Sequence, residues 1–325
     1  MPVFNLIPTM TSDKWESFWE TLTKEETLVV KSKGKTKNGK VFPTEVKAHY
    51  LEFEGKEFVC SFTSDIRIRI KEQKKRKRLA TEKEHFESEL KIATLVQNDF
   101  LPEKPPERFD IDFAAKTIPA KFVGGDFYDF IPLVSDLLAL VLGNVSGRGV
   151  SAALYMARLL SDFRHVAPMT LTPAQALTEV NKILTERSRR GMFATTLLLF
   201  LGLETKLLTA SNAGHQPLII KKKDQVAVNL GNANGAPIGI LPSVDYQQDE
   251  IQLQCGDLVF AYTDRASEAM NADGEPFGVS RIRDRIADFS GSTQELVDQI
   301  EKDIIESVGD KPAHDDLTFI AFQIK

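Results

Sequence analysis

The stretch LLALVLGNVSGRGVSAALYMARLL, residues 137–160, decides what kind of domain this chain forms. Its first six residues are all apolar, which predicts a strand buried on both faces. Three glycines follow within GNVSGRG and predict a tight turn, and an Ala/Leu-rich segment then predicts a buried helix. Turns of this kind place a polar side chain within reach of a ligand. Here that side chain is the uncharged amide of Asn144.

The composition bounds the class of protein. A chain of 325 residues allows about two domains, and 42% hydrophobic with 27% charged residues is typical of a globular protein. No apolar run approaches the ~18 residues of a membrane span, and the N-terminus lacks the pattern of a signal peptide. The net charge of -5 gives no general support for nucleic-acid binding. Cys60 and Cys255 lie in apolar sequence, and we interpret them as reduced core residues of a cytoplasmic protein.

Residues 1–65 predict a helix followed by three strands. Four apolar residues fall on one face of the helix, namely Trp15, Phe18, Trp19 and Leu22. Asn38-Gly39 and Glu54-Gly55-Lys56 predict the two hairpin turns. Alternation of apolar residues in both later strands predicts one buried and one solvated face; these residues are Val46, Ala48, Tyr50, Phe58, Cys60 and Phe62.

This segment resembles the C-terminal half of a PAS sensor domain. The resemblance rests on the hairpin KTKNGKVFPTEVKAHYLEFEGKEF and on the exit SFTSDIRIRIKEQ. It implies an antiparallel sheet without the preceding strands and helices that wall a PAS ligand pocket. We therefore expect this partial PAS domain to support dimerisation rather than ligand sensing.

Residues 66–101 predict one long linker helix. Leu79, Phe86, Leu90, Ala93 and Phe100 form a narrow apolar seam, which suits either a two-helix coiled coil or packing on the neighbouring domain. Apolar helix seams and unpaired strand edges both favour association with another chain. We therefore predict a homodimer through this helix and the partial PAS domain.

A basic run opens the linker helix, and prolines follow its end. The basic run RIRIKEQKKRKR, residues 67–78, could contact an anionic surface, but we favour a solvated helix face paired with the acidic stretch that follows. Pro102, Pro105 and Pro106 end the helix and mark the start of a domain at 102–325.

Acidic residues stand at the ends of several predicted strands in this last domain. Asp126 follows a Gly-Gly pair, Asp264 ends an apolar strand, and Asp315-Asp316 precede the final strand. Each aspartate alone suits a turn or a helix cap. Converging carboxylates from separate strands suit a hard cation such as Mg²⁺ or Mn²⁺.

The order and flanking residues of these motifs resemble the SpoIIE-type branch of the PPM metal-dependent Ser/Thr protein phosphatases. The resemblance spans roughly residues 89–325. The motifs that carry it are PAKFVGGDFYDF, VSGRGVSAALYMA, FATTLLL, SNAGHQPL, GAPIGI, YTDRASEA, Phe277-Gly278 and HDDLTFIAF. It implies an α+β fold, in which two antiparallel sheets pack face to face between helices in an α-β-β-α sandwich.

The resemblance also implies the chemistry. Two Mn²⁺ or Mg²⁺ ions activate a bridging water that attacks phosphoserine or phosphothreonine directly. The positions that match metal ligands are Asp126, Asn144, Asp264 and Asp315, with the Val145 carbonyl as a backbone ligand. Asp316 matches a neighbouring residue of the outer shell. No protein side chain is expected to form a covalent intermediate.

Two positions depart from the family pattern. Asn144 stands where the family has a metal-bridging aspartate, and Arg265 stands where it has glycine. An amide offers one neutral oxygen, and arginine adds a permanent cation beside Asp264. Glycine at 265 would also allow backbone conformations that arginine avoids. Three aspartates and one arginine sum to a formal charge of -2, which balances one divalent ion rather than two.

Two functions follow from these departures. The chain is either a phosphatase of reduced activity with zero or one metal ion, or a pseudophosphatase that binds a phosphoprotein without hydrolysing it. The resemblance implies a bacterial signalling role with a phosphorylated regulatory partner, such as an anti-sigma-factor antagonist. His215 could act near this site, although we favour a structural role. Gly147 and Gly149 are assigned to turn geometry.

Overall fold

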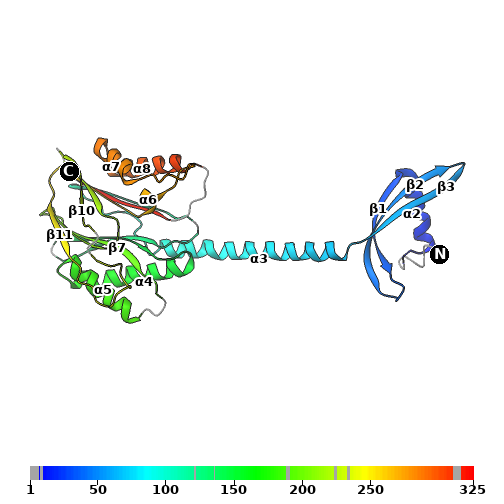
Figure 1. Cartoon of the computed structure of the whole chain (residues 1–325), viewed down its shortest axis with the longest axis horizontal. Helices are drawn as coiled ribbons and strands as arrows, with labels where there is room; N and C mark the ends of the chain where they lie inside the picture. The colour runs from blue at the N-terminus through cyan, green and yellow to red at the C-terminus, as the bar shows by residue number, and fades with distance from the viewer. Residues whose placement is uncertain are drawn as a thin grey trace. The chain divides into compact units, whose positions relative to one another are not determined.

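The computed structural model describes the chain except for residues 1–6, 8–9, 121, 135, 188–190, 223–224, 233–234 and 310–315. The chain divides into two compact units, Met1–Ser88 and Glu89–Lys325 (Figure 1). Helix α3 (Arg67–Asn98) contains the division, so its last turns belong to the second unit.

The first unit is a three-stranded antiparallel sheet with one helix. Helix α2 (Ser12–Glu25) precedes β1 (Thr27–Lys35), β2 (Val41–Phe53) and β3 (Lys56–Asp65), which pair in the order β1-β2-β3. Gly39, Glu54 and Gly55 have positive φ, as tight hairpin turns require. The predicted helix, strands and turns of this region are confirmed.

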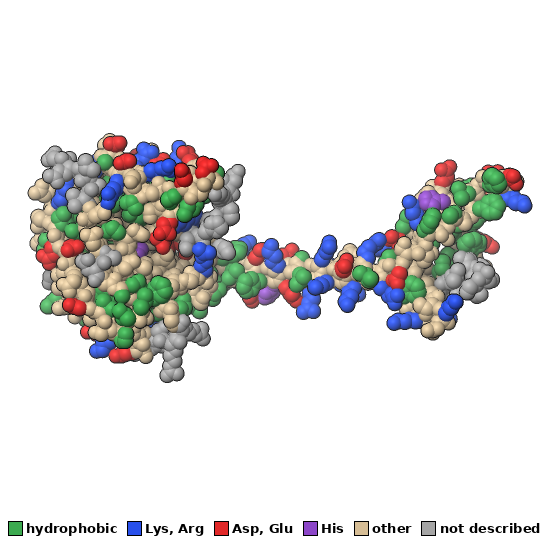
Figure 2. Space-filling model, viewed as in Figure 1, with side chains coloured by type: hydrophobic (Ala, Val, Ile, Leu, Met, Phe, Trp, Pro, Cys, Tyr) green, Lys and Arg blue, Asp and Glu red, His purple; other side chains and the backbone are tan. Residues whose placement is uncertain are grey.

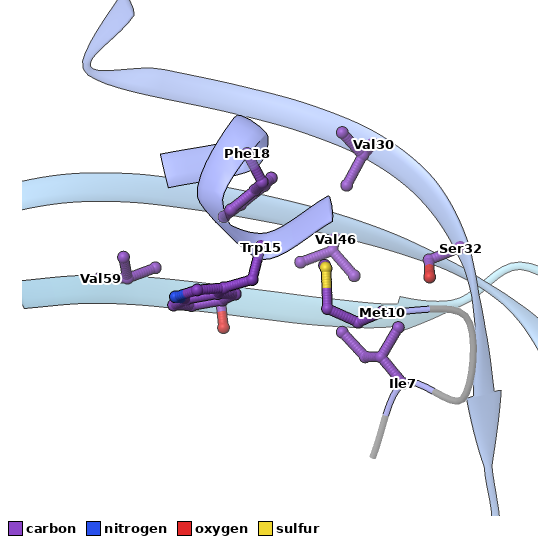
Figure 3. Close-up of a pocket in the computed structure, with 9 residues that line it drawn as sticks. Ile7, Met10, Trp15, Phe18, Val30, Ser32, Val46 and Val59 are labelled. Atoms are coloured by element: carbon purple, nitrogen blue, oxygen red, sulfur yellow. The ribbon is translucent and has the colours of Figure 1, made fainter. Parts of the chain in front are cut away.

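Helix α2 covers one face of this sheet. Leu22 is fully buried, and Trp19 packs edge-on against Tyr50 of β2. Between the helix and the sheet lies a cavity of about 210 Å³, into which Trp15, Val46 and Val59 project (Figure 3). The aromatic residues of α2 therefore supply the apolar cover of this face.

The face of the sheet opposite α2 carries apolar residues that the sequence alternation predicts to be buried. Val59 lines the cavity under α2, so the alternation along β3 turns Phe58, Cys60 and Phe62 to the opposite face. Phe58 and Phe62 are 48% and 64% exposed. Cys60 and Cys255 are also exposed, which makes the core assignment of both cysteines wrong.

Helix α3 has no fully buried residue, and Leu79 and Phe86 of the apolar seam are more than half exposed. Side chains of both charge signs line its length (Figure 2). In the basic run, Arg78 pairs with Glu82 one turn later, and Arg69 pairs with Glu45 of β2. These ion pairs agree with a solvated, locally paired helix face. The coiled coil stays a prediction.

The second unit is a sandwich of two five-stranded antiparallel sheets. One sheet has the order β10-β9-β12-β13-β4 and the other β11-β8-β7-β6-β5. The strands are β4 (Ile111–Ile118), β5 (Asp126–Pro132), β6 (Leu137–Val145), β7 (Ala194–Gly202), β8 (Leu207–Ala213), β9 (Leu218–Lys222), β10 (Gln225–Leu230), β11 (Gln248–Gln252), β12 (Leu258–Tyr262) and β13 (Leu317–Ile324).

Helices cover both outer faces of the sandwich (Figure 1). Helices α4 (Val150–Val166) and α5 (Pro173–Arg187), joined by the short η1 (Ala167–Met169), pack on the sheet that contains β6. Helices α7 (Val279–Asp288) and α8 (Thr293–Val308) pack on the other sheet. The predicted α-β-β-α sandwich is confirmed.

The opening stretch of sequence forms the centre of this arrangement. Strand β6 lies between β5 and β7, so its apolar residues face the other sheet on one side and α4 on the other. Gly147 and Gly149 of the following turn have φ of 95° and 74°, which confirms their assignment to turn geometry. No helix among the described residues is both long and apolar enough to cross a membrane.

Candidate metal-binding site

Polar side chains meet at one end of the sandwich, where four strands begin or end. Asp126 opens β5 and lies opposite Asn144 of β6. Asp264 follows β12, and its Oδ1 lies 3.4 Å from Nδ2 of Asn144. Asp316 directly precedes β13 and also approaches Asp126. The structure thus brings Asp126, Asn144, Asp264 and Asp316 together, whereas Asp315 lies outside the described residues.

Asp126 is a buried carboxylate whose two oxygens have different surroundings. Its Oδ2 accepts hydrogen bonds from the Thr263 hydroxyl at 2.8 Å and the Thr318 hydroxyl at 2.9 Å. Its Oδ1 is buried and has no hydrogen-bond partner among the described residues. Burial raises the pKa of Asp126 well above its usual range, and the negative charges of Asp316 and Asp264 raise it further. A bound cation would offset the free-energy cost of the negative charge on the buried Asp126 carboxylate.

Thr263 and Thr318 are site residues that the sequence analysis missed. Both are fully buried, and each stands next to an acidic motif, in Thr263-Asp264 and in Asp316-Leu317-Thr318. Their roles depend on β12 and β13 being neighbours in the sheet. The only sequence signal was a hydroxyl residue within two positions of each aspartate.

Asn144 and Val145 place two further oxygens against Gly125, the residue before Asp126. A Cβ at Gly125 would lie 2.8 Å from the Val145 carbonyl oxygen and 3.3 Å from Oδ1 of Asn144. Only glycine at 125 therefore lets these oxygens approach the loop so closely. The Val145 amide also donates to the Gly125 carbonyl at 3.1 Å.

Asp316 holds the glycine loop rather than facing open solvent. Its Oδ1 accepts from the Ala120 amide at 2.9 Å and its Oδ2 from the Gly125 amide at 2.8 Å. A Cβ at Gly124 would come within 1.8 Å of that Oδ2, so this position requires glycine. These contacts give Asp316 a supporting role for the segment that carries Asp126.

Asp264 and Arg265 begin the short helix α6 (Arg265–Glu268). Oδ1 of Asp264 accepts from the Arg265 amide at 2.9 Å and so caps the helix. Arg265 is helical and is not among the residues with positive φ. The expectation that position 265 benefits from glycine's conformational freedom is therefore wrong. What still distinguishes Arg265 from the glycine of the family pattern is the positive charge of its side chain.

His215 is buried within the turn after β8. Its amide donates to the Asn212 side chain at 2.7 Å, and Nδ1 lies 3.0 Å from the Thr195 hydroxyl. Burial lowers the pKa of His215 to about 4, and an opposing interaction with the Tyr262 backbone does not offset it. These contacts support the structural role that we favoured for this residue.

His215 should make the fold sensitive to mild acid. Its native pKa of about 4 lies below the ordinary value of 6.5, so protonation favours the unfolded state. The stability it contributes is complete above pH 6.5 and is lost as the pH falls toward 4, by roughly 3 kcal/mol in total. Urea unfolding at pH 4.5–7.5 should show a shallower pH dependence for His215→Gln than for the parent. Equal slopes would contradict this reading, and His85→Gln at an exposed position is the matched control.

The donor chemistry of the site suits a hard divalent ion. Asp126 offers a buried free oxygen, and the Val145 carbonyl, Asn144 and Asp264 offer further oxygens. No group of three His, Cys, Asp or Glu side chains that could hold a metal occurs among the described residues, a set that lacks Asp315. The described residues therefore fit part of a metal site.

Comparison with known proteins gives the family. The model of the stage II sporulation protein E (SpoIIE) family matches residues 135–325. Protein IcfG of Synechocystis sp. is 28% identical over 72% of this chain and 41% of its own length. The phosphoserine phosphatase RsbU of Bacillus subtilis is 27% identical over 74% of this chain and 72% of its own. This chain thus spans less than half of Protein IcfG.

A solved structure shows the same fold. The SiaA-PP2C domain of Pseudomonas aeruginosa aligns with 76% of this chain and 100% of its own, with a TM-score of 0.65 and 22% identity. Its similarity concerns the fold alone.

Proposed function

This chain belongs to the SpoIIE family, and on that premise we propose that its Glu89–Lys325 unit is a metal-dependent phosphatase domain acting on phosphoserine or phosphothreonine of a regulatory protein. The observation that carries the proposal is the buried Oδ1 of Asp126, which has no hydrogen-bond partner among the described residues, at the strand end where Asn144, Val145 and Asp264 also lie. RsbU, a relative over most of its length, is named a phosphoserine phosphatase.

Each residue of the site has a separate task in this proposal. Asp126, Asp264, Asp315 and the Val145 carbonyl would hold Mg²⁺ or Mn²⁺. The bound metal would supply charge neutralisation on the phosphoryl oxygens and a water of lowered pKa. Thr263 and Thr318 bind Oδ2 of Asp126 and so leave Oδ1 for a ligand. Asp316 holds the loop that leads into β5.

We further propose that Asn144 and Arg265 reduce the activity. A neutral amide at 144 removes one negative charge from the site, and the Arg265 guanidinium adds a positive charge next to Asp264. Asp126, Asp264 and Asp315 with Arg265 carry a formal charge of -2, which suits a single divalent ion.

The alternative function is a pseudophosphatase that binds a phosphoprotein. One observation favours it, because the Asn144 amide donates toward Oδ1 of Asp264 in a long contact of 3.4 Å. An amide in that position occupies a carboxylate oxygen that a second metal would need. Both functions use the same fold and differ in whether the site completes hydrolysis.

Mn²⁺ titration by calorimetry, followed by a phosphatase assay on the same sample, tests the proposal. We expect at most one Mn²⁺ ion, bound weakly, with slow hydrolysis of a phosphoserine protein that a chelator abolishes. If the protein binds one Mn²⁺ ion and shows no measurable hydrolysis, the result supports the pseudophosphatase. Two tightly bound ions and brisk turnover would contradict the proposal that Asn144 and Arg265 reduce metal binding and activity.

Helix α3 and the sheet of the first unit are proposed to assemble the protein. The Leu79–Phe100 seam and the exposed face of the β1-β2-β3 sheet both suit a second copy of this chain. The PAS assignment and the domain limits at 65 and 101 likewise stay proposals. The phosphorylated partner is proposed by class, as a regulator such as an anti-sigma-factor antagonist.

A further inference from the structure

The end of helix α3 is hydrogen-bonded to the loop that carries Asp126. Nε2 of Gln97 donates to the Gly124 carbonyl at 2.7 Å, and the Gly124 amide donates to Oε1 of Gln97 at 3.1 Å. One side-chain amide thus satisfies both backbone groups of one residue. The Thr94 hydroxyl, one turn earlier on the same helix face, donates to the Phe122 carbonyl.

The same loop is held from its other side by Asp316. That carboxylate accepts from the Ala120 and Gly125 amides. A cavity of about 20 Å³ between Gln97, Asp126 and Asp316 has room for about one water molecule. The loop is therefore closely confined between α3 and β13, and Asp126 follows it directly.

A glycine pair needs such external support. Gly124 and Gly125 must lack side chains because Asp316 and the Val145 carbonyl approach so closely. For the same reason the pair has no side chain with which to anchor itself, and glycine has the largest conformational freedom to lose. Glutamine suits the task because its amide carries a donor and an acceptor side by side.

We propose that Gln97 is a positioning residue of the metal site. It fixes Gly124 and thereby sets where the free oxygen of Asp126 lies relative to Asn144, Val145 and Asp264. This inference rests on the proposed function, since it assigns Gln97 a role toward the metal. Residues that orient metal ligands from outside the coordination shell typically change metal affinity by about 10–100-fold when replaced.

The test replaces Gln97 by Met, which keeps the length and helix propensity of the side chain and removes both hydrogen bonds. Gln73→Met, at an exposed position of the same helix, is the matched control. Both are made in the parent and in the Asn144→Asp/Arg265→Gly background. The readouts are Mn²⁺ affinity by calorimetry, amide hydrogen exchange of residues 119–126, and the metal-free melting temperature. Thr94→Val serves as a second, milder variant.

We expect Gln97→Met to weaken Mn²⁺ binding about tenfold and to speed exchange in residues 119–126, while Gln73→Met changes neither. Thr94→Val should act in the same direction with a smaller effect. A lower melting temperature with unchanged Mn²⁺ affinity would show a merely structural contact and overturn the positioning role. If neither the parent nor the Asn144→Asp/Arg265→Gly double variant binds Mn²⁺, the proposed function itself is refuted, and the role of Gln97 with it.

Discussion

Asn144→Asp combined with Arg265→Gly should turn this protein into an Mn²⁺-dependent phosphatase at least about a hundredfold more active than the parent. The first change restores a carboxylate opposite Asp126, where it can contact two cations. The second removes the cation beside Asp264. Each single variant leaves one defect in place, so each should recover little, and the effects should be strongly non-additive.

The assay measures hydrolysis of a phosphoserine protein by the parent, both single variants and the double variant. Adding Asp126→Asn to the double variant should abolish the activity, which excludes a contaminating phosphatase. A parent that already turns over briskly with Mn²⁺ would show that Asn144 is an adequate ligand. An inert double variant that binds two Mn²⁺ ions would place the defect in substrate docking.

Asp126→Asn should stabilise the metal-free protein and abolish its response to Mn²⁺. The buried Asp126 carboxylate lies near the charges of Asp264 and Asp316, and burial raises its pKa. A group with a raised native pKa contributes stability at low pH that is lost as the pH rises through that pKa. At neutral pH the neutral amide should therefore raise the free energy of unfolding by about 1–3 kcal/mol, the range for a buried polar group left unsatisfied. It can still accept from Thr263 and Thr318.

Urea unfolding with and without Mn²⁺ measures both effects. Asp316→Asn is the matched control, because the same chemical change there replaces one of the two oxygens that accept from the Ala120 and Gly125 amides with an N–H donor. It should destabilise the protein, opposite in sign to Asp126→Asn. A metal-free Asp126→Asn protein less stable than the parent would show that the carboxylate is well solvated or paired.

Much of the site could be located from the sequence. Acidic residues at the ends of apolar strands predicted that Asp126 and Asp264 meet, and the resemblance to the SpoIIE-type phosphatases added Asn144 to the same site. The supporting residues could not be found in that way. Gln97 is 27 positions from Gly124 and Asp316 is 191 positions from Gly125 along the chain, so their contacts depend on the packing of α3 and β13.

The resemblance to the SpoIIE-type phosphatases implied the sandwich, and the sequence pattern by itself determined the buried strand β6 with its glycine turn and the hairpins of the first unit. These features depend on local periodicity and on turn residues whose backbone conformation is intrinsic to the residue type. The tertiary structure alone decided which face of β3 stays open, and so placed Cys60 at the surface. It also decided that Thr263 and Thr318 bind one oxygen of Asp126 and leave the other without a hydrogen-bond partner in the described part of the chain. Strand register and sheet order set these outcomes, and both arise from contacts between residues far apart in the chain.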